Sequence, residues 1–370
     1  MDLWLFLQNN LYITYQIYQM SQISNSRERM QWVDAMRGFS MIIVVLAHVL
    51  ANMDIGGYKS FLSFSFLTFR MPLFFFVSGF FSYRTIEWWN KSRVIDILKR
   101  KVQAQILCTI IFLSIFQLVT TGSFQNILKT GFGGYWFTIV LFQMYICYLI
   151  FSLISRLINC NITFVALVLL SIAGVVIVAF YKGGGNLTLW NLLYWENLTK
   201  YFQFFTLGIF VSRYRELFFS LIQNTVFSTL MIVGWVGCLL LCYNDFFKTA
   251  YPFLFRVVHD IVVRYCSLMA VIMIFFGKAQ YMSASKVGKH LQFIGRRTLD
   301  IYMIHFFLIP NLRFLGPFLS KGNMFVIQLS ISAVVTLIIV AISLLVSYII
   351  RRSDILAQWL FGVKIKKAQP

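Results

Sequence analysis

A basic side chain and an imidazole are spaced for chemistry within one apolar stretch of the sequence. The segment DAMRGFSMIIVVLAH, residues 34–48, contains Arg37 near its start and His48 at its end. Eleven residues of α-helix rise about 16 Å in just over three turns, so both side chains project from one face. In a membrane helix, a histidine at that depth is a functional candidate, because burying an ionisable ring is costly. The alternative is a histidine that hydrogen-bonds between helices for packing.

The spacing of these two residues suits transfer of an acyl group. An arginine at the membrane edge can hold the phosphates of coenzyme A through charge-assisted hydrogen bonds. The pantetheine arm is long enough to carry a thioester toward His48, where an imidazole can act as a base. We therefore expect Arg37 and His48 to be catalytic, with Arg37 also binding the donor. Asn52 follows on the same stripe, and Asp34 can form a supporting ion pair with Arg37.

The composition predicts that these residues lie in a bundle of membrane helices. The chain has 370 residues, of which 59% are hydrophobic and 12% charged, with a mean hydropathy of +0.77. These values exclude an ordinary soluble domain and predict an all-α polytopic membrane protein. The net charge of +20 does not indicate nucleic-acid binding, because basic residues are favoured on the cytoplasmic side of membranes, where they contact anionic lipids.

A hydropathy window of about 19 residues predicts about ten transmembrane helices in one bundle. The sixth segment is barely half a bilayer long and must extend into its flanks. The expected spans are 38–53, 61–82, 103–121, 135–154, 161–181, 201–212, 217–243, 253–277, 298–315 and 324–350. We interpret 1–26 as an interfacial or disordered leader, or as the product of a misassigned start codon, 27–352 as the membrane domain and 353–370 as a basic cytoplasmic tail.

The distribution of lysine and arginine predicts the orientation. Between the expected spans, 21 such residues lie on the side of the chain ends and 6 on the other side. By the positive-inside rule, both termini are expected in the cytoplasm of an integral plasma (inner) membrane protein. None of the six cysteines has the spacing of a metal site, so we expect no metal.

Five segments together resemble one family of membrane enzymes. Arg37 and His48, separated by ten residues, resemble the signature of the acyltransferase 3 family of integral membrane acyltransferases. Four later segments are similar to further motifs of that family, in the same order along the chain. They are MPLFFFVSGFF at 71–81, YWFTIVLF at 135–142, FFTLGIF at 204–210 and IGRRTLDIYMIHFF at 294–307. Relatives of this length include polysaccharide-modifying and fucose acetylase-like members.

The resemblance implies transfer of an acetyl group from cytoplasmic acetyl-CoA to a hydroxyl of an extracytoplasmic or lipid-linked glycan. His48 corresponds to the family's essential histidine and would act as general base or as acyl carrier. The basic residues Lys99, Arg100 and Lys101 lie where the family carries positive charges thought to meet the donor, although a positive-inside anchor explains them equally well. The expected partners are acetyl-CoA, a glycan and membrane lipids, whereas the oligomeric state, the acceptor sugar and its hydroxyl stay open.

Further polar residues are candidates for lining the cavity. Tyr302 and His305 are three residues apart and share a helix face. Arg256, Asp260 and Arg264 recur every four residues, with His259 alongside, and should face the bundle interior as a polar wall for the acceptor or as an ion-pair lock. Arg70 and Arg313 are expected to join this group.

Two other functions compete with acyl transfer. A transporter of a polysaccharide or small anion would also use many helices and buried charges, although the sequence has no internal repeat typical of transporters. A degenerate scaffold would have a collapsed groove beside His48. An acyltransferase must bind coenzyme A and lose activity when His48 is replaced, whereas an exporter need do neither.

Overall fold

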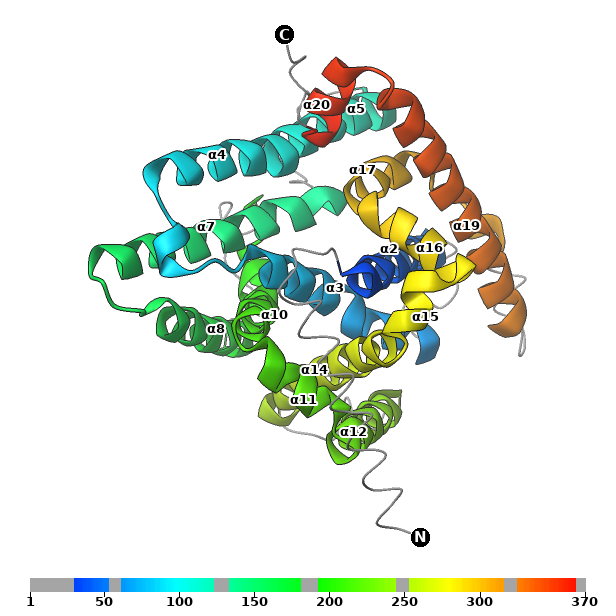
Figure 1. Ribbon diagram of the computed structural model, residues 1–370. Coiled ribbons are helices and arrows are strands. Elements are labelled where there is room, and N and C mark those ends of the chain that lie inside the picture. Colours follow the sequence, from blue (N-terminus) through cyan, green and yellow to red (C-terminus); the bar gives the residue numbers. More distant parts are fainter. Residues whose placement is uncertain are drawn as a thin grey trace.

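The computed structural model describes residues 30–52, 61–122, 133–180, 192–243, 253–315 and 325–363. The expected leader therefore lies outside the described residues. All regular elements in the described part are helical, with η3 a π-helical stretch and η2, η4 and η5 short 3₁₀ turns (Figure 1). They are α2 (Gln31–Asn52), α3 (Phe61–Ser82), η2 (Ile86–Trp88), α4 (Lys91–Lys101), η3 (Val102–Leu107), α5 (Cys108–Thr121), η4 (Gly133–Tyr135), α7 (Trp136–Leu157), α8 (Thr163–Phe180), α10 (Trp195–Arg213), α11 (Arg215–Gln223), α12 (Thr225–Tyr243), α14 (Phe253–Gly277), α15 (Ala279–Ala284), α16 (Lys286–Arg296), α17 (Thr298–Leu308), η5 (Arg313–Leu315), α19 (Phe325–Ile350) and α20 (Asp354–Phe361).

Helices α2 and α3 form the centre of the bundle, and α19 lies along one side (Figure 1). In the most apolar stretch of α2, 72% of the residues are buried, against 28% in α19. The exposed side chains of α19 include Val326, Val334 and Leu345, which are apolar. Apolar residues on the outside are expected where lipid replaces water as the solvent.

Two pairs of helices approach each other closely at glycines. In α2 and α16, a Cβ built at Gly38 would lie 2.0 Å from the carbonyl oxygen of Leu291, and one at Gly295 would lie 1.8 Å from that of Asp34. In α3 and α10, Gly79 faces Phe205 and Gly208 faces Phe76, each at 2.0 Å. Gly79 lies within the MPLFFFVSGFF segment, so that segment carries the close approach of α3 to α10. Small residues at membrane helix interfaces allow this contact between backbones.

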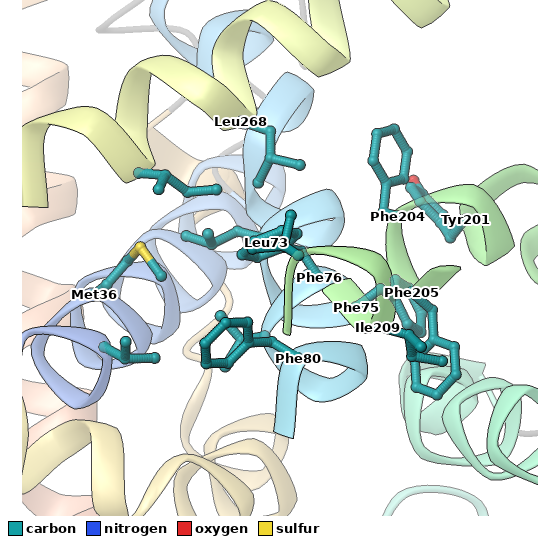
Figure 2. Close-up of a cluster of buried hydrophobic side chains, with 14 of the residues drawn as sticks. Met36, Leu73, Phe75, Phe76, Phe80, Tyr201, Phe204, Phe205, Ile209 and Leu268 are labelled. Atoms are coloured by element: carbon teal, nitrogen blue, oxygen red, sulfur yellow. The ribbon is translucent and has the colours of Figure 1, made fainter. Parts of the chain in front are cut away.

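Aromatic rings fill the space around the α3–α10 contact (Figure 2). Phe75, Phe204 and Phe205 have no exposed surface, and the rings of Phe75 and Tyr201 stack at 5.3 Å between centroids. Leu268 of α14 is also fully buried in this cluster. Lipid tails are as apolar as these rings, so dispersion from close contact stabilises the cluster more than exclusion of water does.

The polytopic all-α class is confirmed, but the count of about ten spans is not. Six helical stretches in the described part of the chain are long and apolar enough to cross a membrane, or seven if the pair α11 and α12 counts as one. That pair was predicted as one span, 217–243, and is instead bent by 75°. Helix α17 has 11 residues, shorter than predicted, and α10 begins earlier than predicted and carries Glu196, Lys200 and Arg213. Helix α17 is too short, and α10 carries too many charged residues, to be counted as a membrane span from length and hydropathy.

Four helices lie where the sequence predicted loop or tail: α4, α15, α16 and α20. Helix α4 holds the basic residues Lys99, Arg100 and Lys101 and runs through η3 into α5. After α19, α20 folds back onto η3 and α5, where Gln103 donates a side-chain hydrogen bond to the Gln358 carbonyl oxygen at 3.1 Å. The ring of Phe361 stacks with that of Phe112, with 6.0 Å between centroids. Gly362, directly after α20, lines the cavity described next.

Candidate active site

A cavity of about 670 Å³ lies among α2, α3, α4, η3, α7 and α17, and four cationic residues line it. We call it the cationic cavity. Its cations are Arg37, Arg84, Arg100 and Lys101, and none of its described lining residues is acidic. The remaining wall is largely apolar or aromatic and includes Met41, Val44, Phe74, Val77, Phe137, Leu141, Tyr145 and Tyr302. The cavity combines a positive end with an apolar shaft.

The cations are held by neighbouring groups rather than left in loose contact. The Arg37 Nη2 donates a hydrogen bond to the Thr298 Oγ1 at 3.0 Å. The expected ion pair with Asp34 is present at 3.8 Å. Lys101 places its Nζ 4.6 Å from the centroid of the Tyr145 ring, a cation–π contact. Since one carboxylate adjoins Arg37 and none lines the cavity among the described residues, the cationic cavity favours an anionic ligand.

Three helices run from the positive end of the cavity to its deep end. Arg37, Thr298 and Tyr145 mark the positive end on α2, α17 and α7, while Val44, Tyr302 and Phe137 lie deeper on the same helices. From Arg37 to Val44 the rise of α2 is about 10 Å. At the deep end, the Phe137 backbone N–H donates to the Tyr302 hydroxyl, which itself donates to the Gly134 carbonyl oxygen. These two hydrogen bonds fix Tyr302 as an end wall.

His48 lies behind this end wall, not on it. It is one helical turn beyond Val44 on α2 and is not among the residues that line the cavity. The sequence predicted a groove reaching from Arg37 to His48, and the structure differs because aromatic rings occupy its inner end. Rings of Phe137 and Tyr302 lie 5.6 Å apart there, and the Phe306 ring lies 5.1 Å from that of His48.

His48 and His305 meet in the interior of the bundle. Their ring centroids are 5.4 Å apart, and His305 has no exposed surface, whereas His48 is half-buried. The Nδ1 of His305 lies 3.0 Å from the Ile301 carbonyl oxygen. A carbonyl oxygen only accepts, so Nδ1 carries the hydrogen and Nε2 of the neutral ring is an acceptor. That Nε2 is buried and has no hydrogen-bond partner in the described structure.

Three of the other predicted residues fall near this pair. The Tyr302 ring centroid is 5.9 Å from that of His305, so the expected shared face is present. Arg70 of α3 brings a positive charge within electrostatic reach of His48, and it is not among the residues that line the cavity beside the charged stripe of α14. Asn52 is not among the residues that line the cationic cavity, and its side chain donates to the backbone oxygen of His48 at 3.2 Å.

The charged stripe of α14 belongs to a different cavity, of about 430 Å³, which we call the α14 cavity. Its lining includes Arg256, Asp260 and Arg264 together with Lys200 and Gln203 of α10. Arg264 donates two hydrogen bonds of 2.8 Å to the Asp260 carboxylate, so the expected pairing is present with this arginine. Arg256 is exposed rather than turned to the bundle interior. His259 is held at the Cys238 carbonyl oxygen.

Two of the remaining predicted residues lie apart from both cavities. Lys99 is exposed and does not line the cationic cavity, although its neighbours Arg100 and Lys101 do. The helical turn of α4 separates them, since consecutive residues point about 100° apart. Arg313 is exposed in η5 and lines neither cavity.

Sequence reasoning missed several residues that build the site. Arg84 lines the cationic cavity, and its position directly after the MPLFFFVSGFF segment was the available signal. Thr298, which holds Arg37, lies within the IGRRTLDIYMIHFF segment at 294–307, whereas Tyr145, which holds Lys101, lies outside the five family-like segments. Asp300 is buried and accepts a bidentate pair of hydrogen bonds from Arg351 at 2.8 and 2.9 Å, which ties α17 to the residue that follows α19.

The chain matches a family described as an acyltransferase domain over residues 30–352, nearly its whole length. The protein belongs to the acyltransferase 3 family. No curated protein and no solved structure matches it. This membrane acyltransferase has almost its entire cationic cavity, both interior histidines and the α14 cavity within the matched residues.

Proposed function

We propose that the protein transfers an acetyl group from cytoplasmic acetyl-CoA to a hydroxyl of an extracytoplasmic or lipid-linked glycan. The cationic cavity is the donor site in this proposal, and Arg37, Arg84, Arg100 and Lys101 hold the phosphates. Its volume of about 670 Å³ lies in the range of small-molecule sites, about 300–1,000 Å³. Both chain termini are then cytoplasmic, in the plasma (inner) membrane.

One observation carries the proposal: a single cavity in an acyltransferase combines four cations at one end with an apolar shaft that ends one helical turn from His48. Coenzyme A has the matching polarity, because its phosphates are anionic and its pantetheine arm is long and weakly polar. Guanidinium groups form charge-assisted, often bidentate hydrogen bonds with phosphate. Acetyl transfer then requires the end wall of Phe137 and Tyr302 to shift as the thioester enters.

In the proposed mechanism, a ring nitrogen of His48 accepts the proton of the acceptor hydroxyl. The hydroxyl oxygen bonds to the thioester carbonyl carbon, the carbon–sulfur bond breaks, and coenzyme A leaves as a thiolate that takes up the proton. His305 positions the reactants in this proposal, since its buried Nε2 is an acceptor without a partner in the described structure and its ring lies 5.4 Å from that of His48. The charge of Arg70 stabilises the oxyanion.

A covalent route uses the same residues. His48 attacks the thioester, forms an acetyl-histidine and releases coenzyme A, and the acceptor hydroxyl then takes the acetyl group. Both routes need His48, but only the second leaves label on the protein.

Membranes carrying the wild-type chain, Arg37→Ala, His48→Ala or the exposed control Lys289→Gln test the function with radiolabelled acetyl-CoA. We expect membranes with the wild type or Lys289→Gln to label glycan. In membranes with Arg37→Ala or His48→Ala, the rate of glycan labelling should be about a hundredfold lower. Label trapped on the wild-type protein but absent from His48→Ala selects the acetyl-histidine route. Equal glycan labelling in all four membranes contradicts the proposal and favours the transporter.

A further inference from the structure

The α14 cavity lies at the opposite end of the bundle from the cationic cavity. Helix α10 runs from Lys200, in the α14 cavity, to Arg213, which shares a small cavity of about 190 Å³ with Arg84. Thirteen residues of helix separate Lys200 from Arg213, a rise of about 20 Å. Because Arg84 also lines the cationic cavity, the two cavities are near opposite ends of α10.

The polar lining of the α14 cavity is suited to an anion. Among the described residues, it contains Lys200, Arg256 and Arg264 and one carboxylate, Asp260. That carboxylate already accepts both hydrogen bonds of the Arg264 fork. Tyr201 supports two of the cations, since its ring centroid lies 5.8 Å from the Arg264 guanidinium and 6.0 Å from the Lys200 Nζ. An amide donor, Gln203, completes the polar edge.

The rest of the wall is suited to a hydrocarbon chain. Val175, Val257 and Ile261 line the cavity between the polar groups. Directly beside them, Val176, Val258 and Val262 are 48%, 50% and 40% exposed. On the outside of a membrane helix, such side chains face lipid. The cavity therefore borders the lipid phase. A ligand with an anionic head group and an apolar tail fits it, because the head group meets the cations and the tail meets the apolar wall.

We propose that the α14 cavity binds the phosphate head group of a lipid, with Lys200 and Arg256 contacting the phosphate oxygens. Arg264 is held by the Asp260 carboxylate and attracts the phosphate by its charge without contacting it. The lipid chain leaves past Val175 of α8 and Val257 and Ile261 of α14. If the lipid is the carrier of the glycan acceptor, an identification that rests on the proposed function, the phosphate anchors it at the end of the bundle remote from the donor.

Binding of farnesyl pyrophosphate to the purified full-length chain in detergent tests the proposal without acetyl-CoA. The site variant is Lys200→Gln/Arg256→Gln. Its matched control is Lys289→Gln/Arg296→Gln, which removes the same charge from exposed residues of α16. We expect the wild type and the control to bind equally, and the site variant to bind about tenfold or more weakly, since charge-assisted contacts are lost.

Two further probes separate the possible sources of the phosphate. Farnesol should not compete, because it lacks the anion, and inorganic pyrophosphate should compete only weakly, because it lacks the chain. Competition by inorganic pyrophosphate as strong as that by farnesyl pyrophosphate would overturn the lipid assignment, and so would equal binding by the site variant. Since no acetyl transfer is measured, failure here is distinct from failure of the proposed function, which the glycan labelling reports.

Discussion

At the residue scale, the interior histidines are the most consequential groups. His305 has a hydrogen on Nδ1, fixed by the Ile301 carbonyl oxygen, and a buried acceptor at Nε2. A buried hydrogen-bond acceptor without a partner lowers the free energy of unfolding by about 1–3 kcal/mol. In the mechanism that we propose, a substrate hydroxyl or the protonated His48, whose ring lies 5.4 Å away, satisfies this acceptor. Sequence spacing placed Tyr302 and His305 on one face, but it could not bring His305 to His48, because that contact joins distant helices.

Replacing His305 by Phe or Asn separates positioning from packing. His305→Phe keeps a ring of similar shape and removes the acceptor, so we expect acetyl transfer to fall about a hundredfold at saturating donor. His305→Asn keeps a side-chain acceptor and should recover part of kcat. The affinity for coenzyme A, measured on the purified chain, should change in neither variant. If both variants lose coenzyme A affinity and thermal stability together, His305 is a packing residue.

At the element scale, glycine contacts hold the helices that carry the site. Val77 and Ser78 of α3 line the cationic cavity, and the neighbouring Gly79 lies against the backbone of α10. The hydropathy pattern predicted most of these helices, including α3 and α14 with the same bounds as observed. It could not predict the bend between α11 and α12 or the short α17, because neither feature depends on hydropathy.

A single methyl group should test the α3–α10 contact. The Cβ of Gly79→Ala would lie 2.0 Å from the Phe205 carbonyl oxygen, so the two helices must separate. We expect the free energy of unfolding to fall by about 1–3 kcal/mol, measured by thermal unfolding in detergent. Gly237→Ala in α12 is the control, since its Cβ would have no described atom within 4 Å. Alanine there should be neutral or stabilising by up to about 1 kcal/mol. Equal stability of the two variants would show that the contact is not tight.

At the scale of the whole molecule, two cavities near opposite ends of one bundle suit a reaction between a cytoplasmic donor and an acceptor across the membrane. The sequence predicted the membrane class, the family and the pairing of Asp34 with Arg37. It grouped Tyr302, His305 and the charged stripe of α14 as candidates for one acceptor cavity, whereas the structure places the histidine pair and the stripe at different sites. That division depends on how α10 and α14 pack against the other helices, and no local pattern encodes it.

The central claim is that the cationic cavity holds coenzyme A, and direct binding to the purified chain tests it. We would measure Kd for coenzyme A with the wild type, Arg100→Gln/Lys101→Gln and the control Lys289→Gln/Arg296→Gln. Loss of two phosphate-binding cations should weaken binding about tenfold or more, whereas the control should match the wild type. Equal affinity in all three proteins, or no binding to the wild type, would contradict the assignment of this cavity as the donor site.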